Sequence, residues 1–319
     1  GAFLLCADLP SGGDFQRLSI GPLPREAAAR LLAERAGVPP TETLKFICGV
    51  LEDIALAVIT VGNLMRESNL TPEETLTVLG TIQTGGMDPI AIALDRAYQM
   101  AFNQLGEAER KILSVAAITP GISMAPQWFN VFLKADVEAP IERLKKLGLL
   151  YNSGTRLRLP TGFRQVARRR SVVNENAVHA RLIPYLLQGL DQGEAFIHAE
   201  LGNFLGALAW AARANQPEDV IKLGRAIDPY LTLHGLWEAW GGVLDAVLNA
   251  AIRIGDRRTE AWALHQLGTR LIGLGNVPKA AELLRHALKL RQKAGDNLGA
   301  ARTQHNLDFL FPLTRPSER

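Results

Sequence analysis

Apolar residues recur three or four positions apart along nearly the whole chain, which is the spacing of one face of a helix. From Pro24 this spacing predicts a helix that ends at Gly37. Residues 39–42 predict the start of a second, long helix that contains the apolar run Ile54–Met65. The segment Thr71–Glu74 predicts another helix start, because Thr can cap the first turn, Pro suits the first helical position and Glu can bond back to the cap.

A second group of helices is expected after Gly85-Gly86, where the chain breaks. The predicted helices span residues 90–104, 107–118, 125–134 and 137–147. Alternating residues at 149–151 and 156–159 then flank residues 152–155, where Gly154 can take the positive φ that a tight turn needs. Helices followed by a short β-hairpin are typical of a winged helix, with the hairpin as its wing.

From about residue 174 onward every segment is expected to be helical, and the last part contains an internal repeat. Residues 255–268 match residues 295–308 at an offset of 295 − 255 = 40, with Gly, Asp, Ala, His and Leu recurring in register. The spacing in the first copy is typical of a tetratricopeptide repeat, two helices around a turn at Gly275-Asn276. Gly268 should lie where two helices approach closely. Because one helix pair cannot bury its apolar stripe alone, such repeats stack into an α-solenoid.

Composition agrees with an all-α fold that carries a small β-hairpin, because aromatic residues make up only 6 % of the chain. Two cysteines, Cys6 and Cys48, are too few for a disulfide framework or a four-thiolate metal site. No signal peptide is recognisable, and the run Ile54–Met65 is shorter than the about 20 residues that span a bilayer. We expect a cytoplasmic protein without a membrane segment.

Positive charge is concentrated around the predicted hairpin, although the net charge of the chain is only +3. Between Glu142 and Arg170 one acidic residue accompanies nine basic ones. The nine are Arg143, Lys145, Lys146, Arg156, Arg158, Arg164, Arg168, Arg169 and Arg170. Two interpretations stay open: a surface for nucleic acid, a phosphate-rich ligand or an acidic partner, or a solvated face balanced by acidic neighbours.

Patterns that carry catalytic or metal chemistry are absent from the sequence. It contains no G-x-x-x-x-G-K-[ST], no H-E-x-x-H, no C-x-x-C and no G-x-S-x-G. None of the six histidines has another histidine three or four residues away, so none forms a helical metal pair. We therefore expect no active site, metal or cofactor in this chain.

A partner-binding surface is expected instead on the repeats, where the first helix of each tetratricopeptide unit lines the groove. The residues that should face it are Trp262, His265, Thr269, Ile272, Arg302 and His305. Exposed aromatic and arginine side chains are the usual anchors of protein interfaces. The alternative is that Trp262 packs between neighbouring helices.

The order of parts resembles the signal-transduction ATPases with numerous domains (STAND), of the NB-ARC type. The segment "GPLPREAAARLLAERAG", a Cys-Gly helix, a winged helix and helical repeats follow one another as in the part of that family behind the nucleotide-binding sheet. The resemblance implies that residues 1–21, with a short strand at Ala2–Cys6, are the remnant of an upstream nucleotide-binding domain. The remaining parts are then a helical domain (22–85), a winged helix (88–172), a helical linker (174–254) and tetratricopeptide repeats (255–311).

Three nucleotide-sensing positions depart from the pattern of the family. Phe3–Asp8 contains no sensor arginine, and Cys48–Leu56 resembles the family's Cys-x-Gly-Leu-Pro-Leu-Ala-Leu without its proline. Leu159-Pro160-Thr161 stands where the family has Met-His-Asp. Cys48, Gly49, Leu159, Pro160 and Thr161 are therefore degenerate sensor positions that are not expected to hold a cofactor, whereas ATP or ADP can bind the full-length parent.

The expected function is that of a non-enzymatic sensor and switch segment. The resemblance implies a protein or peptide ligand on the repeats, an upstream nucleotide-binding domain as neighbour and oligomerisation on activation, with neither nucleic acid nor membrane as partner. Two alternatives are a winged-helix regulator that reads DNA through the basic segment, and a helical-repeat scaffold whose switch no longer cycles.

Overall fold

The structure is a computed structural model that describes residues 21–84 and 88–310. The chain divides into two compact units, residues 1–101 and residues 102–319. The described residues are mostly helical and include one two-stranded antiparallel hairpin, so the predicted all-α class with a small hairpin is confirmed. The predicted strand Ala2–Cys6, the break at Gly85-Gly86 and the end of the last repeat at residue 311 lie outside the described residues. The finer five-part division stays a prediction.

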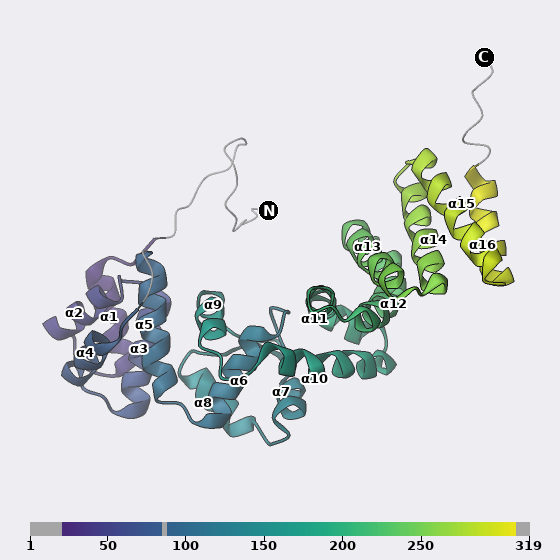
Figure 1. The fold of residues 1–319 in the computed structure, drawn as a ribbon. Coiled ribbons are helices and arrows are strands. Elements are labelled where there is room, and N and C mark those ends of the chain that lie inside the picture. The colour runs from purple at the N-terminus through teal and green to yellow at the C-terminus, as the bar shows by residue number, and fades with distance from the viewer. Residues whose placement is uncertain (1–20, 85–87, 311–319) are drawn as a thin grey trace, which may run out of the picture. The chain divides into compact units, whose positions relative to one another are not determined.

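The first unit is built from helices (Figure 1). They are α1 (Arg25–Ala36), α2 (Glu42–Val50), α3 (Ala55–Ser68), α4 (Pro72–Thr81) and most of α5 (Pro89–Asn103). Gly37 ends α1 with a φ of 73°, as predicted. Thr71 and Glu74 form the predicted reciprocal cap of α4. Between α1 and α3 the backbones approach closely, because a Cβ on Gly62 would lie 2.6 Å from the Cβ of Arg35.

The predicted single long helix after residue 39 is wrong, because the chain forms α2 and α3 with a break between them. Glu52 and Asp53 have φ angles of 51° and 54°, which no α-helix contains. A tertiary contact explains the break: the Asp53 carboxylate accepts a 2.7 Å hydrogen bond from Nε of Arg25, and its carbonyl accepts another from the backbone N–H of Leu23. The partner lies 28 residues away, out of reach of a local pattern.

The second unit begins with short helices around a hairpin. They are α6 (Glu107–Ile118), α7 (Pro126–Leu133) and α8 (Glu138–Lys146), followed by β1 (Tyr151–Ser153), β2 (Arg156–Arg158) and α9 (Thr161–Arg169). The three helices confirm the prediction to within one residue. The hairpin is tighter than predicted, because Ser153 pairs with Arg156 and leaves two residues in the turn, where Gly154 has a φ of 62°. Leu157 exchanges two 2.8 Å backbone hydrogen bonds with Met124, which joins the hairpin to the chain ahead of α7.

Helix α9 was not predicted. Its buried side chains, Phe163, Val166 and Ala167, have helical spacing but span little more than one turn. Pro160 precedes its first turn and arginines close its last turn, an order that favours the helix dipole. A pattern this short does not distinguish a helix from the turn that follows a hairpin.

The rest of the second unit is helical, as predicted. It contains α10 (Glu175–Gln188), a 3-10 turn η1 (Gly189–Gln192), α11 (Glu194–Arg213), α12 (Pro217–Leu233), α13 (Trp237–Ile254), α14 (Arg257–Gly273), α15 (Val277–Lys293) and α16 (Asn297–Leu310). The last five helices begin at residues 217, 237, 257, 277 and 297, at a constant period of 20 residues. Two residues before each start the backbone has a positive φ, at Asn215, Gly235, Gly255, Gly275 and Gly295.

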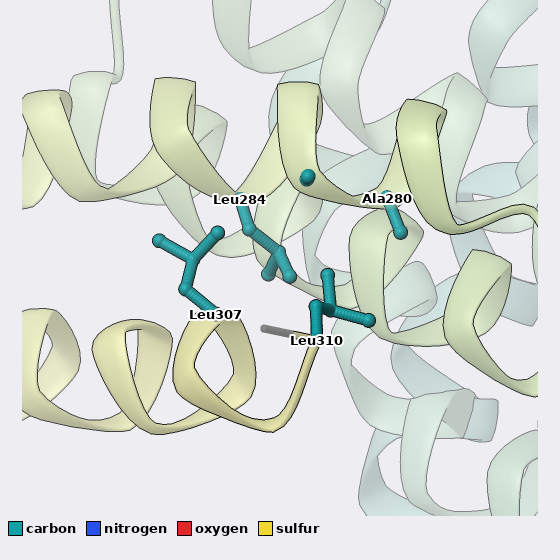
Figure 2. Close-up of a cluster of buried hydrophobic side chains, with 5 residues drawn as sticks. Ala280, Leu284, Leu307 and Leu310 are labelled. Carbon is teal, nitrogen blue, oxygen red and sulfur yellow. The ribbon is translucent and has the colours of Figure 1, made fainter. Parts of the chain in front are cut away.

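The predicted 40-residue offset is therefore one pair of helices, and α12, α14 and α16 are equivalent first helices. Consecutive helices pack side by side (Figure 1). Gly268 lies at the expected close approach, because a Cβ there would be 2.7 Å from Cγ of Leu284. Between α15 and α16 the buried side chains of Ala280, Leu284, Leu307 and Leu310 interlock (Figure 2). The 40-residue unit is longer than the 34 residues typical of a tetratricopeptide repeat, because each helix of the α14–α15 pair has 17 residues.

Candidate partner-binding site

The predicted anchor Trp262 is half-buried on α14. The guanidinium carbon of Arg225, on α12, lies 5.0 Å from the centre of its ring, a cation–π contact. The same guanidinium also approaches Thr259 Oγ1 at 3.5 Å. Trp262 therefore lies at the seam between two first helices and keeps part of its surface exposed, which combines the two alternatives that the sequence left open.

His265 and Thr269 lie at the seam between α14 and α16. His265 Nδ1 is 3.2 Å from the hydroxyl of Thr303, and the Thr269 hydroxyl accepts a 2.9 Å hydrogen bond from Asn306. Burial lowers the pKa of His265 to about 4, and the positive charges of Arg291 and Arg302 act in the same direction. At neutral pH His265 is therefore an uncharged imidazole that joins adjacent first helices.

The other three predicted residues differ in exposure. Ile272 packs against the cluster between α15 and α16, which includes Leu284 and Leu310. Arg302 and His305 are exposed on α16. The structure thus brings Trp262, His265 and Thr269 into one row on α14 and places Arg302 and His305 in the equivalent row of the next first helix.

Sequence reasoning missed three cations of the same surface: Lys222 and Arg225 on α12, and Arg258 on α14. The 40-residue repeat indicates these positions in the sequence. Lys222, Trp262 and Arg302 occupy one position of successive first helices. Arg225 lies one turn further along, at the position that His265 and His305 take in α14 and α16.

The predicted basic patch has a different environment. Arg156, on β2, donates to the Glu200 carboxylate at 2.7 Å and to the hydroxyl and carbonyl of Ser123 at 2.9 Å. Arg164, on α9, donates to the carbonyls of Thr119 and Gly121 at 2.7 and 2.8 Å. Both guanidinium groups therefore hold the loop between α6 and α7, and we call this the arginine junction.

Helix α11 completes the arginine junction. Glu200 and Asn203 are only 2 % and 3 % exposed, and Asn203 donates to Glu200 while its amide oxygen accepts from the backbone N–H of Gly121 at 2.6 Å. Gly206 lies against Pro120 so closely that a Cβ would overlap the proline ring. The hairpin, the loop and the long helix α11 are thereby joined by buried, hydrogen-bonded charges.

The other four arginines of the patch differ in exposure and in whether they have a partner. Arg168 forms an ion pair with Glu175 at 2.6 Å, Arg158 is half-buried, Arg169 is exposed and Arg170 is half-buried with a partner. Four of the six side chains, Arg156, Arg164, Arg168 and Arg170, thus have partners within the chain, as the interpretation with acidic neighbours anticipates. The number of basic residues in this segment therefore overstates the positive charge that a ligand could contact.

The degenerate sensor positions are divided between cores and surfaces. Cys48 is buried in α2, and burial raises the pKa of its thiol to about 12. Gly49 lies under the side chain of Arg25. Leu159 is buried, Pro160 precedes α9 and Thr161 is its exposed first residue. The side chains at Cys48 and Leu159 therefore pack inside their own units.

Two further observations concern other classes of site. Among the residues that the structure describes, no group of three His, Cys, Asp or Glu side chains is arranged to hold a metal ion. Within the same residues no helix combines the length and the apolar character needed to cross a bilayer. A hollow of about 410 Å³ beside α10 is lined by Asn176, Pro184, Trp210 and Asp219, among others, without a cluster of catalytic side chains.

Comparison with known proteins gives a distant likeness among solved structures. No protein-family model matches the sequence, and no curated protein matches it. Among solved structures, a signal transduction ATPase with numerous domains from Pyrococcus horikoshii, which has a tetratricopeptide repeat sensor, matches with 14 % identity and a TM-score of 0.38. The match covers 92 % of this chain and 57 % of that protein, so the chain spans little more than half of its length. A TM-score this low does not assign the chain to a family.

Proposed function

We propose that this chain is the sensor and switch segment of a STAND-type signalling ATPase, and that it binds a protein or peptide through the first helices of its repeats. The observation that carries the proposal is the constant 20-residue period of the last five helices. Helices stacked at a constant period present equivalent positions side by side, which creates an extended binding surface. Trp262, Arg225 and Arg302 are aromatic and arginine side chains of the kind that dominate interface energies.

The switch part of the proposal rests on the order of helical unit, hairpin-bearing unit and repeats. The arginine junction supports it, because a force or displacement on α11 reaches the hairpin through buried charges rather than through a loose linker. In this proposal residues 88–172 form the winged helix of the switch, whereas the NB-ARC-type nucleotide core and the activated oligomer belong to the full-length parent. The chain itself contributes binding and coupling, without catalysis.

A helical-repeat scaffold with a switch that no longer cycles is the second candidate. The observation that favours it is the burial of Cys48 and Leu159, because side chains packed in a core do not reach a nucleotide. A DNA-reading winged helix is less favoured, since Arg156 and Arg164 donate to groups of the protein itself.

Differential capture tests the binding proposal. The wild-type chain, Trp262→Ala and the control Trp237→Ala, which alters an exposed tryptophan of α13, are used as baits for proteins of the native host. The proposal expects a partner that wild type and Trp237→Ala retain and Trp262→Ala loses, and it fails if no partner distinguishes Trp262→Ala from Trp237→Ala.

Nucleotide titration distinguishes the switch from the scaffold. Labelled ATP and ADP are titrated into the full-length parent and into this chain. Binding by the parent alone supports a switch whose nucleotide core lies in the parent. Binding by neither favours the scaffold.

A further inference from the structure

The first helices present a continuous row of cations and one aromatic ring. We define the first-helix stripe as Lys222 and Arg225 of α12, Arg258 and Trp262 of α14, and Arg302 and His305 of α16. Contacts across both seams show that the row is continuous. Arg225 lies over the Trp262 ring at 5.0 Å, and Asn306 of α16 donates to Thr269 of α14 at 2.9 Å.

Four permanent positive charges of this stripe form no ion pair among the described residues, although Arg225 also interacts electrostatically with the carboxylates of Asp228 and Asp256. Lys222, Arg225, Arg258 and Arg302 are exposed, and none forms an ion pair with a residue that the structure describes. Arginines elsewhere in the same unit differ, since Arg143, Arg156 and Arg168 pair with Glu109, Glu200 and Glu175. Arg169 and Arg285 are also exposed without an ion pair among the described residues, so the stripe is distinguished by the alignment of its cations on neighbouring first helices.

The acidic groups near the stripe are already engaged or lie at its margin. Asp228 is buried and accepts hydrogen bonds from Trp240 and Gln266 at 2.7 and 2.8 Å. Asp256 caps the first turn of α14, and Asp308 accepts from Gln304. On α12 the exposed carboxylate nearest to Lys222 in the sequence is Glu218, one helical turn before it.

Apolar side chains alternate with these charges. Leu298 and Phe309 are 66 % and 59 % exposed and lie on the same line of α16 as Arg302, four residues before it and seven after it. Trp262 adds a half-exposed ring on α14. A surface that alternates cations with exposed apolar groups complements a polypeptide that alternates carboxylates with apolar side chains.

Nucleic acid fits the stripe less well. Duplex DNA carries one negative charge per about 1.7 Å of its axis. Four cations spread over three helices neutralise few phosphates at that spacing, and the exposed leucine has no role with a phosphate chain. A short peptide with a few carboxylates carries about as many negative charges as the stripe carries positive ones.

We infer that the first-helix stripe binds an acidic peptide segment of a partner protein, with carboxylates at Lys222, Arg225, Arg258 and Arg302 and an apolar side chain on Trp262. The inference rests on the proposed function and adds the chemistry of the ligand. It makes the stripe selective for negative charge, because a basic segment would bring like charges together.

Selection from a random 12-residue phage-displayed peptide library tests the inference. The wild-type chain is the bait, and the selected peptides are measured as fluorescent synthetic peptides by anisotropy. We expect peptides with net negative charge and at least one aromatic or large aliphatic residue. Affinity should fall about 30-fold in Trp262→Ala, the loss typical of an interface anchor, and about tenfold in the exposed charge reversal Arg302→Glu.

Matched variants keep the result interpretable. Arg285→Glu reverses an exposed charge on α15, and Trp237→Ala removes an exposed ring of α13; both should bind within twofold of wild type. Thermal unfolding by circular dichroism verifies that each variant is folded, and Lys222→Glu repeats the charge reversal at a second exposed site. Affinity for the acidic peptides should also weaken between 50 and 300 mM NaCl.

Several outcomes would overturn the inference in different ways. Selected peptides that are neutral or basic but still depend on Trp262 would contradict the acidic ligand and leave the peptide-binding function standing. An absence of selected peptides, or equal losses in Arg285→Glu and Arg302→Glu, would remove the acidic-peptide site. Binding of a mixed-sequence oligonucleotide that is lost in Arg302→Glu, without any acidic peptide, would assign the stripe to nucleic acid instead.

Discussion

The arginine junction and the first-helix stripe contain similar side chains in opposite environments. At the junction Arg156 and Arg164 are directed at a buried carboxylate and at backbone carbonyls. In the stripe Arg258 and Arg302 are exposed and have no counter-ion among the described residues. The arginines around the hairpin lie close together in the sequence, and most of them have partners within the protein. The cations of the stripe lie far apart in the sequence, and the fold brings them together on one surface. Charge that can meet a partner is therefore decided by the tertiary fold.

The largest expected effect is the loss of Arg156. In Arg156→Met the Glu200 carboxylate, 2 % exposed, keeps its burial and loses its ion-pair partner. Removing one member of a buried pair lowers the free energy of unfolding by about 3–5 kcal/mol. Urea unfolding followed by tryptophan fluorescence measures the change, with Arg169→Met, an exposed arginine of the same segment, as control. A loss equal to that of the control would mean that Glu200 is not buried as described.

The next effect tests the close packing of α11 on the loop. Gly206→Ala places a methyl group into the Pro120 ring, and overpacking of this kind lowers the free energy of unfolding by roughly 3 kcal/mol. Gly242→Ala is the matched control, because nothing lies within 4 Å of its Cβ position in α13. There the change should raise stability by about 0.5–1 kcal/mol, since alanine favours the helix. Thermal unfolding of both variants should therefore shift in opposite directions.

Local patterns were sufficient for the parts of the fold that rest on neighbouring residues. The cap at Thr71, the stop at Gly37 and the 40-residue repeat could be predicted, because each depends on a few positions in sequence. The break between α2 and α3 could not, because Asp53 is held by an arginine 28 residues away.

The candidate site divides in the same way. Trp262 and Arg302 follow from helical spacing and from the repeat, and the register would also have indicated Lys222. The engagement of Arg156 and Arg164 could not be predicted, because their partners lie 33 to 45 residues away and most are backbone carbonyls or a glutamate of another helix. Sequence identifies which side chains are charged, and only the fold identifies which of them are neutralised.

A smaller effect concerns pH and the seam between α14 and α16. Because burial lowers the pKa of His265 to about 4, the unfolded chain binds the proton more readily than the folded one below the ordinary value of 6.5. The stabilisation is complete above pH 6.5 and is lost as the pH falls toward 4. Discounted for partial exposure, this loss is about 1–2 kcal/mol.

The variant His265→Gln isolates that contribution. It removes the titrating group and should flatten the dependence of unfolding free energy on pH between 6.5 and 4. His305→Gln, at the equivalent exposed position of α16, should keep the slope of the wild type. His179, buried against Trp210 with a pKa also lowered to about 4, maintains a residual slope in both variants. Equal slopes in His265→Gln and His305→Gln would contradict a buried, neutral His265.

The smallest expected change in stability decides whether the stripe and the arginine junction differ. Arg302→Met should change the free energy of unfolding by less than about 0.5 kcal/mol, because an exposed side chain without an ion pair contributes little to the folded state. Urea unfolding measures it beside Arg156→Met under the same conditions. A loss above about 1.5 kcal/mol would show that Arg302 holds the fold together as Arg156 does, and the stripe would then no longer differ from the junction. A negligible loss of stability combined with a loss of peptide affinity would show that Arg302 contributes to binding and not to folding.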